Sequence, residues 1–147
     1  MKKIILSIFS LLFLITSCAS DDDIVKFVTP DYISGKWFFK EVGTVNGQSV
    51  VVYKDYINQE TCEQDNLSLV NTDKTFSLSD FMIEGQTCVN KGYTGSFSIV
   101  NRDLKLNYTQ ENNNIETVYT IVSLTNTDLI ISTLNDLGEV TFYKLSK

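Results

Sequence analysis

The chain of 147 residues has few side chains of the kinds that carry out chemistry, and it has no histidine. Without histidine, neither a histidine-based metal site nor the usual Ser-His-Asp or Cys-His catalysis can form. The densest group of carboxylates is Glu60, Glu63 and Asp65, and paired carboxylates can act as acid and base. Loop carboxylates are usually only solvated, however, and nothing in the sequence places two of them in a cleft. We therefore expect no catalytic residue, no metal, no cofactor, and a protein that is not an enzyme.

The first of the three cysteines, Cys18, ends a segment with the features of an export signal. A charged start, Met1-Lys2-Lys3, precedes a short apolar run and the small residues Thr16-Ser17, which is typical of a secretory signal. The run is too short to span a membrane, which takes about 20 apolar residues. An ordinary signal peptide with an incidental cysteine is one interpretation. The ending Ile15-Thr16-Ser17-Cys18 also resembles the bacterial lipobox, in which the cysteine becomes the acylated first residue.

This resemblance implies a diacylglycerol on the sulfur of Cys18 and an acyl chain on its amine. Two or three chains hold a protein stably on a membrane. We therefore predict a lipoprotein signal peptide at residues 1–17, a lipidated cysteine with an acidic tether at 18–31, and one folded domain at 32–147. Ser20-Asp21-Asp22-Asp23 is either a solvated spacer or, by resemblance, the surface-export signal of Bacteroidetes-type lipoproteins. The expected location is the outer membrane, lipid-anchored and exposed at the cell surface.

The other two cysteines, Cys62 and Cys88, are expected to form a disulfide, because an exported domain meets an oxidising environment. A bridge closing a loop of about 27 residues contributes roughly 3–4 kcal/mol on the chain-entropy model. A reactive thiol or a metal site is the alternative. Neither a histidine nor a CxxC spacing accompanies the pair.

Composition limits the class of partner. Loss of residues 1–17 removes two lysines and moves the formal net charge from −6 to −8. Phosphate binding needs clustered Lys and Arg, so this acidic chain is not expected to bind nucleic acid. Aromatic residues make up 12% of the chain, which favours a packed core over disorder. The length suits one domain, which we expect to be a monomer.

The elements that must position these residues are short strands. After Pro30 the apolar residues alternate with period two, and turn residues recur about every ten positions. Asn46-Gly47 is the strongest hairpin signal, and no helix is predicted. We predict an all-β fold, an up-and-down antiparallel barrel of about eight strands; a Greek-key sandwich is the alternative. The predicted strands are 37–42, 50–53, 67–70, 76–79, 93–100, 104–108, 117–124, 129–132 and 140–143.

The chain also resembles the lipocalin-like domains of small bacterial lipoproteins. Gly35-Lys36-Trp37 matches their G-x-W motif, Cys62 precedes an alternating hairpin, and a glycine-aromatic strand follows at 92–97. The resemblance implies that Trp37 plugs the base of a barrel. An arginine near the last strand stacks on this tryptophan in lipocalins, and Lys144 is the residue available here.

The resemblance leads us to expect a small apolar or amphipathic ligand. Aromatic residues of the lower barrel and of its mouth are the candidates, although alternation cannot tell which face of a strand points inward. Each of them can equally be a core residue. A second hypothesis is a surface module that binds protein or glycan through loops such as Tyr108 with 112–114. The predicted ligand residues are Trp37, Phe39, Phe97 and Tyr119 in the lower barrel, with Tyr53 and Tyr93 at the mouth.

Overall fold

The protein is described by a computed structural model, which describes residues 30–56, 64–135 and 137–147. A single helical turn, α1 (Pro30–Ile33), precedes the strands. No helix in the described ranges is long and apolar enough to cross a membrane. The strands are β1 (Gly35–Val45), β2 (Val51–Asp55), β3 (Asn66–Val70), β4 (Thr75–Ser79), β5 (Phe81–Glu84), β6 (Thr87–Asn90), β7 (Tyr93–Val100), β8 (Asp103–Gln110), β9 (Asn113–Leu124), β10 (Asp128–Leu134) and β11 (Val140–Ser146).

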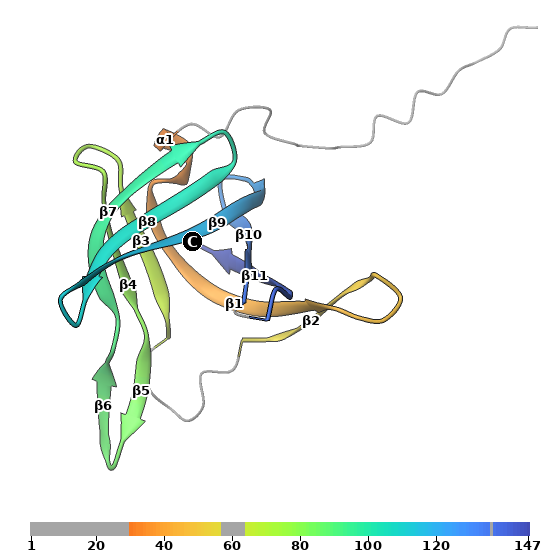
Figure 1. Ribbon diagram of the computed structural model, residues 1–147, viewed down its shortest axis with the longest axis horizontal. Helices are drawn as coiled ribbons and strands as arrows, with labels where there is room; N and C mark the ends of the chain where they lie inside the picture. The colour runs from red at the N-terminus through yellow and green to blue at the C-terminus, as the bar shows by residue number, and fades with distance from the viewer. Residues whose placement is uncertain (1–29, 57–63, 136) are drawn as a thin grey trace, which may run out of the picture.

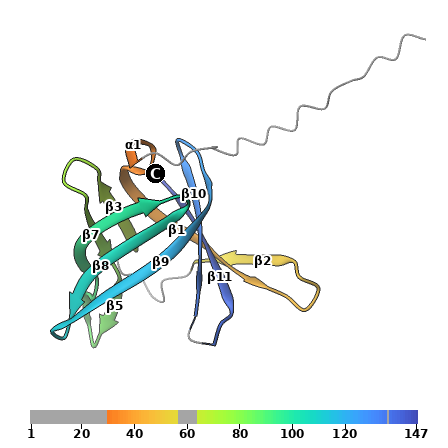
Figure 2. The ribbon, with the colours of Figure 1, turned by 45° about the horizontal axis from the view of Figure 1, so that its top comes forward.

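The strands form a closed antiparallel barrel. The sheet order is β11-β10-β9-β8-β7-β4-β3-β1-β2, and β1 also pairs with β11. The ring therefore contains eight strands, with β2 as an additional strand on β1 (Figures 1 and 2). The predicted all-β barrel is confirmed, and α1 is an addition that the sequence analysis did not predict.

Two hairpins extend the barrel at one end. β1 is long enough to pair with β3 through residues 35–38 and with β2 through residues 41–45. β5 and β6 form a separate two-stranded sheet beyond β4 and β7, and this hairpin points away from α1 (Figure 1). β5 and β6 were not among the strands predicted from the sequence.

The barrel has two distinct ends. Because neighbouring strands are antiparallel, the turns at 71–74, 101–102 and 125–127 lie at the same end as α1, which we call the α1 end (Figure 1). The hairpins at 46–50, 85–86 and 111–112 lie at the opposite end, the hairpin end. Alternate residues of each strand face the interior, as the pairs Trp37 with Leu67 and Ile121 with Ile131 illustrate. The buried core is Ile33, Trp37, Phe39, Leu67, Leu69, Phe76, Phe97, Leu104, Leu106, Ile121, Leu124, Leu129, Ile131 and Leu145.

Trp37 closes the α1 end. Its side chain is fully buried, and its Nε1–H donates a hydrogen bond of 2.7 Å to the Ile33 carbonyl. The ammonium of Lys147 lies 4.5 Å from the centre of the tryptophan ring, within the range of a cation–π contact. The assignment of this role to Lys144 is wrong. Lys144 instead pairs with Glu41 at 2.7 Å, because it lies on the outer face of β11.

Candidate functional site

Five tyrosines gather inside the barrel towards the hairpin end, and we call them the tyrosine cluster. All five are half-buried. Four lie within strands, and the fifth directly follows a strand. Register explains why they face inward: Tyr119 pairs with the buried Leu104, and Tyr143 pairs with the buried Ile131. The cluster consists of Tyr56 at the end of β2, Tyr93 in β7, Tyr108 in β8, Tyr119 in β9 and Tyr143 in β11.

One half of the cluster is built around Phe39. The Phe39 ring centre lies 5.1 Å from that of Tyr56 and 5.6 Å from that of Tyr143, the second contact being edge-to-face. Tyr143 in turn meets the edge of Tyr119 at 6.5 Å. Edge-to-face and tilted pairs at these spacings are favourable beyond the area that they bury. These four rings, three from strands and Tyr56 from the residue after β2, therefore form one continuous aromatic wall.

The other half is built around Phe76. Tyr93 and Tyr108 stack with ring centres 3.8 Å apart, and the Phe76 ring meets each of them at 6.3 Å. Gly95 pairs with both Phe76 and Tyr108 across the sheet. A Cβ at Gly95 would lie 2.0 Å from the Asn107 carbonyl oxygen, so only glycine permits this close approach of strands.

Asp65 fixes the edge of the cluster. The Tyr56 hydroxyl donates to Asp65 Oδ2 at 2.9 Å, and the Phe81 N–H donates to Oδ1 at 2.8 Å. Asp65 as a whole is 3% exposed. Asp65 was a candidate catalytic partner of Glu60 and Glu63, which both lie outside the described residues. Its hydrogen bonds show a positioning role, because they tie Tyr56 to the start of β5.

The hydroxyls of Tyr56, Tyr93, Tyr119 and Tyr143 act as neutral polar groups. Burial raises the pKa of Tyr119 to about 12, with further contributions from Tyr143 and Tyr108. Burial also raises the pKa values of Tyr56, Tyr93 and Tyr143; the hydrogen bond to Asp65 adds to the effect at Tyr56. The charged form of a phenol is disfavoured where water is excluded. These hydroxyls can therefore donate and accept hydrogen bonds, but they offer a ligand no charge near neutral pH.

The structure brings together only some of the predicted ligand residues. Tyr93 and Tyr119 belong to the tyrosine cluster, and Phe39 packs against it. Trp37 and Phe97 are buried in the core, with 0% and 3% exposure.

Tyr53 lies apart from the cluster, on the outer face of the sheet. Its ring lies over Gly43, and the Lys144 ammonium is 3.8 Å from the ring centre.

Tyr56, Tyr108 and Tyr143 were not among the predicted ligand residues. Tyr108 was considered as a surface recognition residue; its ring is half-buried and stacks on Tyr93. The signal that could have found Tyr108 is its phase: it follows the buried Leu104 and Leu106 at a spacing of two along one strand.

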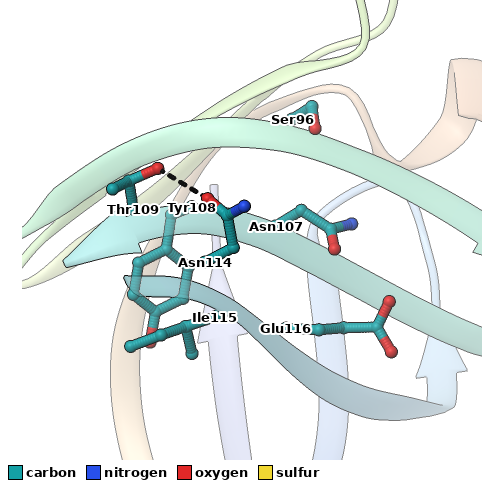
Figure 3. A pocket seen from close by; sticks show the side chains of 7 residues that line it. All are labelled: Ser96, Asn107, Tyr108, Thr109, Asn114, Ile115 and Glu116. Carbon is teal, nitrogen blue, oxygen red and sulfur yellow. Dashed lines mark hydrogen bonds between the residues drawn. The ribbon is translucent and has the colours of Figure 1, made fainter. Parts of the chain in front are cut away.

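A polar groove of about 410 Å³ lies on the outside of the barrel at the hairpin end. Figure 3 shows its residues on neighbouring strands, with the Thr109 hydroxyl donating to Asn114 Oδ1 at 3.2 Å. The amides and hydroxyls come from outward positions of β7, β8 and β9. The lining residues are Ser96, Asn107, Tyr108, Thr109, Asn114, Ile115 and Glu116.

The predicted lipidation and disulfide sites lie largely beyond the described ranges. Cys18 and Cys62 are outside the described residues. Cys88 is exposed in β6, where it pairs with Ile83 across the hairpin. Within the part of the chain that the structure describes, no group of three His, Cys, Asp or Glu side chains is arranged to hold a metal ion.

Comparison with known proteins gives a family match. The sequence model of a family described as a lipocalin-like domain matches residues 33–131. No protein with a curated description matches the chain significantly.

Solved structures of similar shape include a complex of bovine odorant-binding protein with undecanal, which is 17% identical (78% of this chain, 70% of that chain, TM-score 0.44). The bovine lipocalin allergen Bos d 2 is 11% identical (82% and 75%, TM-score 0.47). A dog lipocalin allergen is 15% identical (78% and 71%, TM-score 0.40).

Proposed function

Because the chain belongs to the lipocalin-like domain family, we propose that it binds a small apolar or amphipathic molecule inside its barrel, at the tyrosine cluster. The family match covers residues 33–131, which include four of the five cluster tyrosines. A closed barrel of eight strands has an interior that is filled by side chains or holds one small ligand. In this proposal the protein is a monomeric binding protein that has no catalytic residues and no cofactor.

The observation that carries this proposal is the difference between the two ends of the barrel. At the α1 end, Trp37 and Ile33 are fully buried, and the indole N–H of Trp37 donates a hydrogen bond to the Ile33 carbonyl. Towards the hairpin end, five half-buried tyrosines present ring faces and hydroxyls to one interior region. Ligand sites are mostly apolar with a few placed polar groups. The matching ligand has a flat or apolar body and one or two groups that hydrogen-bond to phenols.

We also propose that the protein is an exported lipoprotein of the outer membrane, held by acyl chains on Cys18 and exposed at the cell surface. The lipobox-like ending at Cys18 and the adjacent acidic residues support this location. We also propose a Cys62–Cys88 disulfide, because an exported protein reaches an oxidising compartment in which disulfides form and persist.

Binding can be tested with the full chain extracted in mild detergent, using the neutral fluorescent probe N-phenyl-1-naphthylamine. We expect saturable fluorescence enhancement with a stoichiometry of about one, as for a single pre-formed pocket. Native mass spectrometry of the same preparation should show a small molecule that leaves on denaturation.

Matched variants assign the site. Tyr119→Phe and Tyr143→Phe keep the rings but remove hydroxyls from the interior, and we expect each to weaken the binding of polar competitors. Tyr53→Phe removes a hydroxyl from the outer face and should leave binding unchanged. Absence of any bound mass together with non-saturable probe fluorescence would reject an interior ligand site.

A further inference from the structure

The polar side chains of the outer groove lie in two rows across β7, β8 and β9 (Figure 3). Strand pairing sets the first row, because Ser96 pairs with Asn107, and Asn107 pairs with Glu116. The second row is the pair Thr109 with Asn114, two residues further along β8 and β9. Neighbouring strands lie about 4.8 Å apart, so the groups of one row can contact the same small molecule. The groove volume of about 410 Å³ is in the range of small-molecule sites.

These side chains keep most of their hydrogen-bonding groups available. Among the residues that the structure describes, the Ser96 hydroxyl and the Asn107 carboxamide have no hydrogen-bond partner. The Asn114 carboxamide uses its Oδ1, which accepts from the Thr109 hydroxyl at 3.2 Å, and its two N–H donors remain. Carboxamides donate and accept, whereas a carboxylate only accepts. The groove therefore presents donors and acceptors side by side, which suits a ligand whose hydroxyls each donate and accept.

The charge in the groove is balanced. Glu116 is the one charged side chain among the described residues that line it, and its Oε1 lies 3.6 Å from the Lys105 ammonium. Phosphate and similar anions bind to clustered Lys and Arg, which this lining lacks. A cationic ligand would have to compete with Lys105 for the carboxylate. The groove therefore favours a ligand without net charge.

Strand pairing and lining also exclude two other classes of ligand. β8 pairs with β7 over residues 103–108 and with β9 over residues 103–110, so its main chain is occupied on both sides. A peptide that adds as a strand needs a free main-chain edge. A lipid-like molecule is also a poor match, because only Tyr108 and Ile115 contribute apolar surface to the lining.

We propose that the outer groove binds a neutral saccharide. A sugar ring carries hydroxyls around its rim and apolar C–H groups on its faces. The two polar rows, with Tyr108 and Ile115 paired between them, present the same combination. Asn107 and Asn114 hydrogen-bond to neighbouring sugar hydroxyls, and Glu116 accepts from a further hydroxyl. This site goes beyond the proposed function, because it lies on the outside of the barrel and does not depend on a ligand at the tyrosine cluster.

The test is an NMR titration of the full chain in a detergent without a sugar headgroup, since such a headgroup would compete. The probes are the neutral oligosaccharides maltohexaose, xylohexaose and mannohexaose. We expect at least one of them to shift the side-chain amide signals of Asn107 and Asn114 saturably, with a stoichiometry of about one. The side-chain amide of Asn135, which donates to Glu139 at 3.0 Å in a different hairpin, should not shift.

Matched variants assign the site. Asn107→Ala removes the carboxamide at the centre of the first row and should weaken binding about tenfold, because its hydrogen bonds to sugar hydroxyls are lost. Asn113→Ala removes the same group from β9 outside the lining and should leave the affinity unchanged.

A charged probe tests the preference for neutral ligands. Hexagalacturonate carries a carboxylate on each ring, and we expect it to bind at least about tenfold more weakly than the neutral probe, because Glu116 repels it. Glu116→Gln keeps the shape of the side chain and removes its charge. This variant should retain the neutral probe within about threefold, and it should reduce the disadvantage of hexagalacturonate.

Three results would overturn the proposal. The first is the absence of a saturable shift with all three neutral probes up to about 10 mM, where even millimolar affinity is detected. The second is binding that Asn107→Ala leaves unchanged, or signal shifts confined to the tyrosine cluster. The third is hexagalacturonate binding as tightly as the neutral probe. Binding of N-phenyl-1-naphthylamine tests the interior site separately, and a saccharide in the outer groove should not displace it.

Discussion

The raised pKa of Tyr119 predicts that alkaline pH destabilises the protein more steeply than it destabilises a Tyr119→Phe variant. Burial in the barrel raises this pKa from the ordinary 10.0 to about 12, and Tyr143 and Tyr108 add to the effect. Between these two pH values the unfolded chain has lost the phenol proton and the folded chain retains it. The free energy of unfolding therefore falls as pH rises through this range. The contribution of Tyr119 to the free energy of unfolding is fully present below pH 10, and it is lost as the pH rises above the pKa of Tyr119 in the folded state.

The magnitude follows from the size of the pKa difference. One pKa unit corresponds to about 1.4 kcal/mol, so Tyr119 alone accounts for up to about 1.4 kcal/mol per pH unit and roughly 3 kcal/mol in all. Tyr119→Phe keeps the ring and its contact with Tyr143 but removes the proton. Above pH 10, we expect the free energy of unfolding of the variant to fall less steeply with pH, by up to about 1.4 kcal/mol per pH unit.

Urea unfolding at pH values from about 8 to 11.5 measures the effect, since the denaturant midpoint and slope give the free energy at each pH. Trp37 is the single tryptophan and is fully buried, so its fluorescence reports unfolding. Val122→Ala, a non-titrating change on the exposed side of the same strand, is the control and should shift the curve without changing its slope. Equal alkaline slopes for the wild type and Tyr119→Phe would refute the burial of this hydroxyl.

Three further changes test other parts of the structure. Trp37→Phe removes the hydrogen bond from Nε1–H to the Ile33 carbonyl and leaves a gap at the closed end. Unfolding followed by circular dichroism should show that the free energy of unfolding falls by about 2–4 kcal/mol, and a fall of less than half of that would contradict the plugging role. Gly95→Ala places a Cβ against the β8 main chain, and thermal unfolding should show a free energy of unfolding at least about 3 kcal/mol below that of the wild type. Gly47 has open space around it, so Gly47→Ala should change the free energy of unfolding by no more than about 0.5 kcal/mol. Cys18→Ala should move the protein from the membrane to the soluble fraction, and continued membrane partitioning would exclude lipidation as the anchor.

Sequence alternation was sufficient to predict most of the strands. β7 was predicted with the bounds that it has, Tyr93–Val100, and the hairpin at Asn46-Gly47 joins β1 to β2 as expected. These elements depend on contacts between neighbours in sequence, which propensity and turn chemistry describe well. The end of β1, the end of β8 and the start of β9 were less predictable, because residues 43–45, 109–110 and 113–116 stay in strands through pairing with another strand.

The tyrosine cluster could not be predicted to the same extent. Tyr93 and Tyr119 were proposed as ligand residues, but Tyr53, proposed with them, packs outside the barrel beside Lys144. Tyr56 and Tyr143 were not proposed at all. A strand with aromatic or β-branched residues on both faces looks the same whichever face is buried, so a shift of one residue reverses the assignment.

The sequence by itself determined the all-β class, most of the strand positions and the lipobox-like motif, because each of these is contained in short stretches of neighbouring residues. Tertiary structure alone decided which faces point inward, that Lys147 covers Trp37, and that Asp65 holds Tyr56. It also decided that β9 pairs with β10 only from Leu124 to Thr120. These features depend on the closing of β1 onto β11, which brings residues from opposite ends of the chain into register. No local pattern contains that information, since it arises only when the ring of strands closes.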